Sequence, residues 1–132
     1  MNTPRPGTRW LAFSAALLAA TAAALAAVGS HALTGRLAPA ELTSFNTAVA
    51  FQFVNAVGLL GAAWARERLE GSRLAAVSGW MLLAGVLLFC GSIYLARLGL
   101  TAQSGPAAPL GGSLAILAWL GLAAAFASYR RR

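Results

Sequence analysis

The sequence predicts an all-α membrane protein, an antiparallel bundle of four transmembrane helices with the N and C termini cytoplasmic. The chain has 132 residues, which suits a single domain 1–132, and it is 59% hydrophobic but only 10% charged. An ordinary soluble domain is about 25% charged. About 20 apolar residues in a helix cross the hydrocarbon core of a bilayer. Four runs of that length contain no Asp, Glu, Lys, Arg or His, and they place the predicted spans at residues 10–28, 45–65, 74–96 and 110–129.

The composition argues against the other classes of small protein. A disordered chain has low hydrophobicity, and a disulfide scaffold needs more cysteine than the single Cys90. Membrane β-strands are about 10 residues long and alternate in polarity, which these runs do not do. The helices of a soluble bundle carry a charged outer face, which is absent here. The net charge of +7 would suit a nucleic-acid binder, but such a protein keeps a polar surface on which to spread that charge.

The first predicted span, residues 10–28, follows two basic residues, Arg5 and Arg9. A basic start, an apolar run and small residues at 24–27 also fit a cleaved signal peptide. The run is longer than the usual signal core of about 7–15 residues, which favours a retained span. The span is rich in Ala at helical spacing, and such a small face either packs inside the bundle or makes a homodimer.

The second predicted span, residues 45–65, belongs to a helix that we expect to begin earlier, near Pro39. Gly35 suits the left-handed position after the preceding helix, and Pro39 suits a first helical turn. Glu41 then lies near the positive end of the new helix. Gln52 and Asn55 are three residues apart, so we expect them to share one face of this helix.

The third and fourth predicted spans, residues 74–96 and 110–129, differ in the loops that precede them. The short charged loop 66–73 makes spans two and three antiparallel neighbours. The segment 99–109 is rich in Gly and Pro, which indicates an irregular loop, and Pro109 is predicted to start the last helix. Glycines in spans two, three and four are expected to pack the helices against one another.

The arginines predict the orientation, because positively charged short loops stay in the cytoplasm. Only Arg36 and Arg97 fall on the other side. Trp10 and Trp64 lie near the predicted inner interface, whereas Trp119 falls near the middle of its span, where packing explains it. We expect anionic lipid headgroups, and no nucleic acid, to be the partner of the basic side. That side holds Arg5, Arg9, Arg66, Arg68, Arg73, Arg130, Arg131 and Arg132.

Polar side chains within the predicted spans or just beyond their outer ends are the candidate functional residues, because a polar group in a membrane is expensive unless it is paired. Apart from Asn55, they gather toward the outer half of the predicted bundle. Two interpretations stay open: a hydrogen-bond network between helices, or a polar cavity for a solute, an ion or a proton. The candidates are His31, Gln52, Asn55, Ser92, Tyr94 and Arg97.

Catalytic chemistry is not expected from this inventory. The chain has one His, no Asp and no acidic residue inside a span, so it lacks a carboxylate pair for acid–base work. Cys90 has no basic neighbour in sequence, and one His with one Cys is too few for a structural zinc site. We therefore expect no enzyme activity, no cofactor and no metal.

Four short motifs follow one another in order along the chain: Gly29-Ser-His-Ala-Leu33, Phe45-x-Thr-x-x-x-Phe-Gln-x-x-Asn-Ala56, Phe89-Cys-Gly-Ser-Ile-Tyr94 and Pro109-Leu-Gly-Gly112. Together they resemble the family of small membrane proteins called transmembrane protein 256-like, also called domain-of-unknown-function family 423. The resemblance implies a four-helix membrane fold with a retained first span, and it brings no established activity. Asn55 stands where the family pattern has a second His, which counts against a site built on two His side chains. Phe51, Cys90 and Ala108 also depart from the pattern.

The sequence thus predicts a multi-pass protein of the bacterial cytoplasmic membrane that acts as a non-enzymatic structural or accessory component. The predicted partner is a further copy of the chain, in a homo-oligomer, or another membrane protein. The alternative is a small oligomeric transporter or channel, with a pathway lined by Gln52, Asn55, Ser92 and Tyr94.

Overall fold

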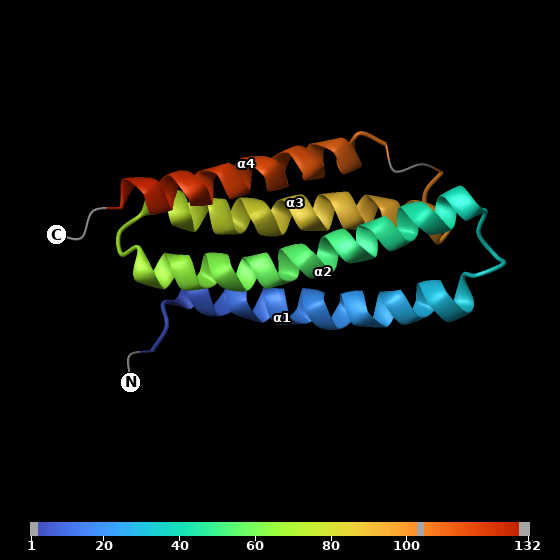
Figure 1. The fold of residues 1–132 in the computed structure, drawn as a ribbon, viewed down its shortest axis with the longest axis horizontal. Coiled ribbons are helices and arrows are strands. Elements are labelled where there is room, and N and C mark those ends of the chain that lie inside the picture. Colours follow the sequence, from blue (N-terminus) through green and yellow to red (C-terminus); the bar gives the residue numbers. More distant parts are fainter. Residues whose placement is uncertain (1–2, 103–104, 130–132) are drawn as a thin grey trace.

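The computed structural model describes residues 3–102 and 105–129 and contains four long α-helices (Figure 1). Each helix is long and apolar enough to cross a membrane, and the described residues form no strand, so the predicted all-α membrane fold is confirmed. The helices are α1 (Pro6–Ala27, continued by the π-helical turn η1, Val28–Ala32), α2 (Pro39–Arg68), α3 (Arg73–Arg97) and α4 (Ala107–Ser128).

The four helices lie in a row in chain order, each antiparallel to the next (Figure 1). Close contacts join α1 to α2, α2 to α3 and α3 to α4, so every tight interface connects helices that are consecutive in sequence. The two outer helices, α1 and α4, lie at opposite edges of the row. This arrangement leaves many large apolar side chains exposed on both faces, as suits helices surrounded by lipid.

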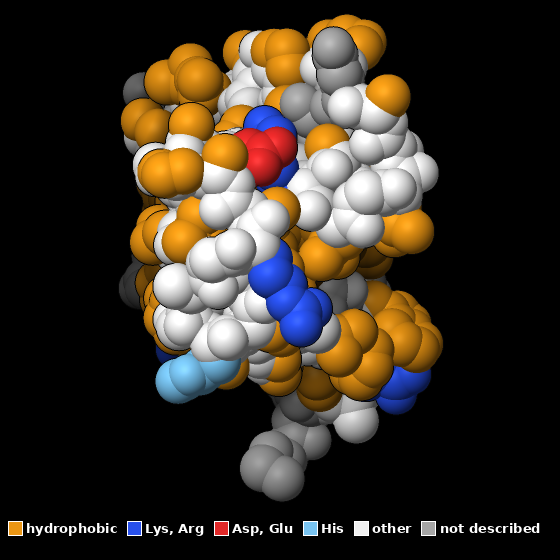
Figure 2. All heavy atoms as spheres, turned by 90° about the vertical axis from the view of Figure 1, so that its right-hand side faces the viewer, with side chains coloured by type: hydrophobic (Ala, Val, Ile, Leu, Met, Phe, Trp, Pro, Cys, Tyr) orange, Lys and Arg blue, Asp and Glu red, His pale blue; other side chains and the backbone are white. Residues whose placement is uncertain are grey.

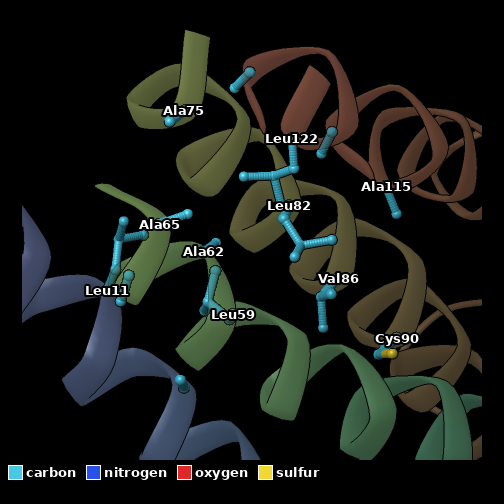
Figure 3. Packing of buried hydrophobic residues seen from close by; sticks show 14 of the residues in the cluster. Leu11, Leu59, Ala62, Ala65, Ala75, Leu82, Val86, Cys90, Ala115 and Leu122 are labelled. Carbon is cyan, nitrogen blue, oxygen red and sulfur yellow. The ribbon is translucent and has the colours of Figure 1, made fainter. Parts of the chain in front are cut away.

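The core consists of small and medium side chains along the middle of the row. Figure 3 shows Leu59 and Ala62 of α2 facing Leu82 and Val86 of α3, with Leu122 of α4 beside them. All five side chains are buried. Alanine at many core positions lets the helix backbones approach closely, which is how helices associate where the surrounding lipid is as apolar as the core.

The tightest approach joins α3 to α4 through two glycines. A Cβ at Gly85 would lie 2.8 Å from the Gly111 carbonyl oxygen and 2.8 Å from the Ala115 nitrogen. A Cβ at Gly111 would lie 2.7 Å from the Gly85 carbonyl oxygen. Each glycine therefore makes room for the backbone of the opposite helix, which gives the Pro-Leu-Gly-Gly motif a packing role.

The helix ends follow the local sequence. α2 begins at Pro39, as predicted, and Gly35 has the expected positive φ of 81°. α4 begins at Ala107, two residues before the predicted start at Pro109, because proline is tolerated anywhere in the first turn, where the N–H groups have no helical partner. α3 begins after Ser72, whose Oγ accepts the Ala75 N–H at 3.2 Å.

Candidate functional site

Gln52 joins three helices through its side-chain amide. From α2, its Nε2 donates to the Leu18 carbonyl oxygen and to the Thr21 Oγ1 of α1, both at 2.8 Å. Its Oε1 accepts the hydroxyl of Tyr94 on α3 at 2.8 Å. The side chain is 3% exposed. Both N–H groups and the oxygen are thus engaged between helices, which removes the cost of burying an amide.

The α2–α3 contact continues around Tyr94 and Cys90. The Tyr94 ring packs against Phe45 with ring centroids 5.3 Å apart. One turn earlier on α3, the Cys90 Sγ lies 3.3 Å from the Ala48 carbonyl oxygen, to which it donates. The thiol is buried and serves an interhelical contact, so it is not presented to solvent as a nucleophile.

Asn55 connects α2 to α4. Its Oδ1 accepts the Trp119 Nε1–H at 3.0 Å, and its Nδ2 donates to the Phe51 carbonyl oxygen of its own helix at 2.9 Å. The indole fits over Gly58, where a Cβ would overlap it. Gln52 and Asn55 were expected to share one face, but the structure directs them to different neighbours: Gln52 toward α1 and α3, and Asn55 toward α4.

An ion pair closes the bundle end that carries the α1–α2 connection. The Arg97 Nη1 lies 3.2 Å from the Glu41 Oε1, and the Glu41 Oε2 accepts the Ala38 N–H at 3.0 Å. Figure 2 faces this end and shows acidic and basic side chains in contact near its top, with further basic side chains elsewhere on the same face. Glu41 therefore stabilises the start of α2 and holds the end of α3 against it.

The structure does not bring His31 or Ser92 into this set of contacts. His31 lies in η1 and is exposed, and its imidazole makes no hydrogen bond to the part of the chain that is described. The Ser92 hydroxyl donates to the Phe89 carbonyl oxygen at 2.9 Å, within its own helix. The predicted candidates therefore separate into the junction at Gln52 and Tyr94, the Asn55 contact, the Arg97 ion pair and these two side chains.

A cavity of about 190 Å³ lies beside the Gln52 junction. Thr21, Gln52 and Tyr94 supply polar atoms to its wall, and the rest of the wall is apolar apart from the Cys90 thiol. It lies between α1 and α3. The arrangement therefore offers a small site where a few polar atoms face a mainly apolar space.

Within the predicted membrane spans, three contributors were not among the predicted site residues: Thr21, Cys90 and Trp119. Thr21 is, with Ser14, one of two hydroxyl side chains in an otherwise apolar span, and this is a usable signal. Packing explains the ring of Trp119 but not the hydrogen bond of its N–H. The sequence presents Cys90 only as a nucleophile or a metal ligand, and neither role predicts its interhelical contact. Pairing across helices decides these roles, and no spacing within one helix encodes it.

Four apolar antiparallel helices, joined by buried polar side chains, define a small polytopic helical membrane protein. The chain belongs to the family described as protein of unknown function (DUF423), whose sequence profile matches residues 25–112. That range contains η1, α2, α3 and the start of α4.

The relatives are membrane proteins from diverse bacteria. The chain is 32% identical to the UPF0382 membrane protein YwdK of Bacillus subtilis, over 86% of this chain and 93% of that protein. It is 33% identical to the UPF0382 membrane protein SSP2132 of Staphylococcus saprophyticus, over 80% and 86% of the two chains. It is 28% identical to a UPF0382 membrane protein of Haemophilus influenzae, over 76% and 79%. No solved structure matches the chain significantly.

Proposed function

We propose that this chain is a non-enzymatic structural or accessory component of the bacterial cytoplasmic membrane. The observation that carries the proposal is the Gln52 junction, the set of hydrogen bonds that join Gln52 to α1 and to Tyr94 of α3. Both N–H groups and the oxygen of this buried amide form hydrogen bonds to other helices. A polar side chain used in this way fixes how the helices pack.

The placement of the acidic side chains supports a non-enzymatic role. Glu41 is paired with Arg97 at one end of the bundle. Glu67 lies in the last turn of α2, and Glu70 follows in the loop to α3. None of the three carboxylates lies beside the buried polar groups at Gln52 and Tyr94, so acid–base catalysis there has no carboxylate to use.

The proposed orientation places the start of α1, the α2–α3 loop and the end of α4 in the cytoplasm. These segments lie at one end of the bundle (Figure 1), and the arginines near them outnumber those at the other end. Trp10 and Trp64 are about half-exposed close to that end, as interfacial anchors are.

Cysteine labelling tests this orientation. In a Cys90→Ala background, an impermeant maleimide should label Arg36→Cys in intact cells and Glu70→Cys only after lysis. Each variant carries a single reactive thiol at an exposed position, and the two positions lie at opposite ends of the bundle. Labelling of Glu70→Cys in intact cells would overturn the orientation.

Reconstitution tests the proposed role. Purified protein in liposomes should leave proton flux, followed with entrapped pyranine, at the rate of protein-free liposomes. The same should hold for glycerol and urea permeation, followed by light scattering. A partner that stays bound through purification in mild detergent would support an accessory role. Flux of any of the three solutes by the purified protein alone would overturn it.

The second candidate function is a small oligomeric transporter or channel, and the cavity beside Gln52 is the observation that favours it. The cavity holds about 190 Å³ and presents polar atoms of Thr21, Gln52 and Tyr94. Under this alternative, Gln52→Leu abolishes flux while the far-UV circular dichroism of the protein is unchanged. Thr47→Val is a matched control, because Thr47 is exposed on the same helix and its hydroxyl donates within that helix.

A further inference from the structure

A second cavity lies at the opposite end of the molecule from the Glu41–Arg97 ion pair, and basic side chains line it. It holds about 190 Å³. Arg5 reaches it from the segment before α1, Arg66 from the last turn of α2, and Arg73 from the first residue of α3. Figure 1 shows the start of α1 beside the α2–α3 connection at this end. Three segments distant in sequence therefore bring three guanidinium groups to one small space.

The charges in this cavity are incompletely paired. Arg5 engages two carboxylates that do not line the cavity: its Nη2 lies 3.8 Å from the Glu70 Oε1, and its backbone N–H donates to the Glu67 Oε1 at 3.1 Å. The side chains of Arg66 and Arg73 form no hydrogen bond and no ion pair within 4.0 Å with the described residues, although Glu67 is near enough for its charge to interact with that of Arg66. The Arg66 Nε is buried from solvent and has no partner, a condition that costs free energy unless a ligand supplies an acceptor.

The local backbone holds these groups in place. A Cβ at Gly7 would lie 2.5 Å from the Arg66 Nη2 and 2.7 Å from its Cζ, so the absence of a side chain at Gly7 lets the guanidinium rest against α1. Ser72 caps α3 and also lines the cavity. The N-terminal end of α3 therefore adds a positive dipole end and first-turn N–H groups to the arginine side chains.

We propose that this cavity binds one phosphate group of an anionic phospholipid. A guanidinium presents paired N–H donors that match phosphate oxygens, and three guanidinium groups around one small cavity suit a single phosphate group. The membrane is the source that the surroundings favour. Trp10 and Trp64, about half-exposed near the same end, place the cavity at the depth of lipid headgroups. The proposal rests on membrane insertion and the proposed orientation, and it is independent of whether the protein moves a solute.

The test measures lipid binding to the full chain in detergent micelles at 0.15 M salt, by thermal stabilisation on titration with phosphatidylglycerol. Phosphatidylcholine, inorganic phosphate and glycerol 3-phosphate are the comparison ligands. Arg66→Gln and Arg73→Gln remove one cavity arginine each. Arg9→Gln is the matched control, because Arg9 is an exposed arginine at the same end that does not line the cavity. Gly7→Ala is a further variant that shifts the Arg66 guanidinium and keeps every charge.

We expect phosphatidylglycerol to stabilise the unmodified protein more than phosphatidylcholine does. Arg66→Gln and Arg73→Gln should each raise its Kd about tenfold, the effect of losing a charge-assisted hydrogen bond. Arg9→Gln should change the Kd by less than about twofold, because salt screens charges outside the site. Gly7→Ala should also weaken binding. Arg73 is exposed, so its replacement keeps the test valid even if the Arg66 variant unfolds.

Three outcomes would overturn the proposal. Equal stabilisation by the two lipids would exclude recognition of an anionic headgroup. An effect of Arg9→Gln as large as those of the cavity variants would assign binding to diffuse surface charge. Inorganic phosphate or glycerol 3-phosphate binding as tightly as the lipid would assign the site to a soluble anion. Failure of the proposed orientation would show in cysteine labelling, and failure of the proposed function in liposome flux, so each is distinguishable from failure of this site.

Discussion

Replacing Gln52 with Leu tests whether the buried amide holds the helices together. The change removes the bonds to the Leu18 carbonyl oxygen, the Thr21 hydroxyl and the Tyr94 hydroxyl, each 2.8 Å long. Leucine fits an apolar environment and keeps the helical propensity of α2. The decrease in unfolding free energy therefore measures the loss of the interhelical hydrogen bonds and the cost of leaving their partners unpaired.

The expected loss follows from the bond count. Interhelical hydrogen bonds in membranes contribute about 0.6 kcal/mol each on average, so three give about 2 kcal/mol of unfolding free energy. Tyr94→Phe removes one of the three and keeps the ring against Phe45, so we expect it to cost about 0.6 kcal/mol. Because the two changes remove one shared bond, their effects should not add, and the double variant should resemble Gln52→Leu alone.

Equilibrium unfolding in mixed micelles, followed by far-UV circular dichroism, measures these free energies. Thr47→Val serves as the control, with an expected change within about 0.5 kcal/mol, since its hydroxyl donates to the Thr43 carbonyl oxygen of its own helix. If Gln52→Leu unfolds at the same free energy as the unmodified protein, or if the two single effects add in full, the Gln52 junction does not hold the bundle together.

Three further predictions concern the other interhelical contacts, all measured by the same unfolding assay. Gly85→Ala should lower the unfolding free energy by about 1–3 kcal/mol, because its methyl group meets the backbone of α4. Gly91→Ala on the same helix meets open space and should be neutral or stabilising. Equal effects of the two variants would contradict the close α3–α4 approach. Trp119→Phe should cost about 0.6 kcal/mol through loss of the bond to Asn55, and an unchanged free energy would mean that only the ring matters. Glu41→Gln should lower the unfolding free energy by about 0.5–1 kcal/mol at low salt and by less at high salt, because the Glu41–Arg97 ion pair is partly exposed and salt screens it. A decrease that does not depend on salt would argue against a Coulombic origin.

Much of the fold could be predicted from composition and spacing. A run of about 20 uncharged residues has few alternatives to a membrane helix, because only a helix pairs its own backbone groups within lipid. The short charged loop between the second and third spans predicts antiparallel neighbours. Local signals at Gly35 and Pro39 also predicted where α2 begins. The predicted spans lie inside the observed helices, with η1 counted as the continuation of α1, and only Tyr129 falls just past the end of α4. The helices are longer than the predicted spans because the composition marks only their apolar part.

The site was predictable only as a set of side chains. Polar residues inside a span must find partners, so Gln52, Asn55 and Tyr94 could be selected in advance. Which partner each one finds depends on helix rotation and on crossing geometry. Gln52 and Asn55 are three residues apart, and the small angle between them is enough to direct one toward α1 and α3 and the other toward α4. Trp119 reaches Asn55 only because Gly58 leaves space for the indole.

The sequence by itself determined that this protein has four membrane-crossing helices, and it restricted the polar groups to a small set, because the cost of polar groups in lipid acts on every residue separately. Only the tertiary structure decided that the helices lie in a row, that Gln52 joins three of them, and that Arg5, Arg66 and Arg73 line one cavity. These features depend on the close approach of residues far apart in the chain. Such approaches are set by how small side chains interlock, and no local pattern encodes them.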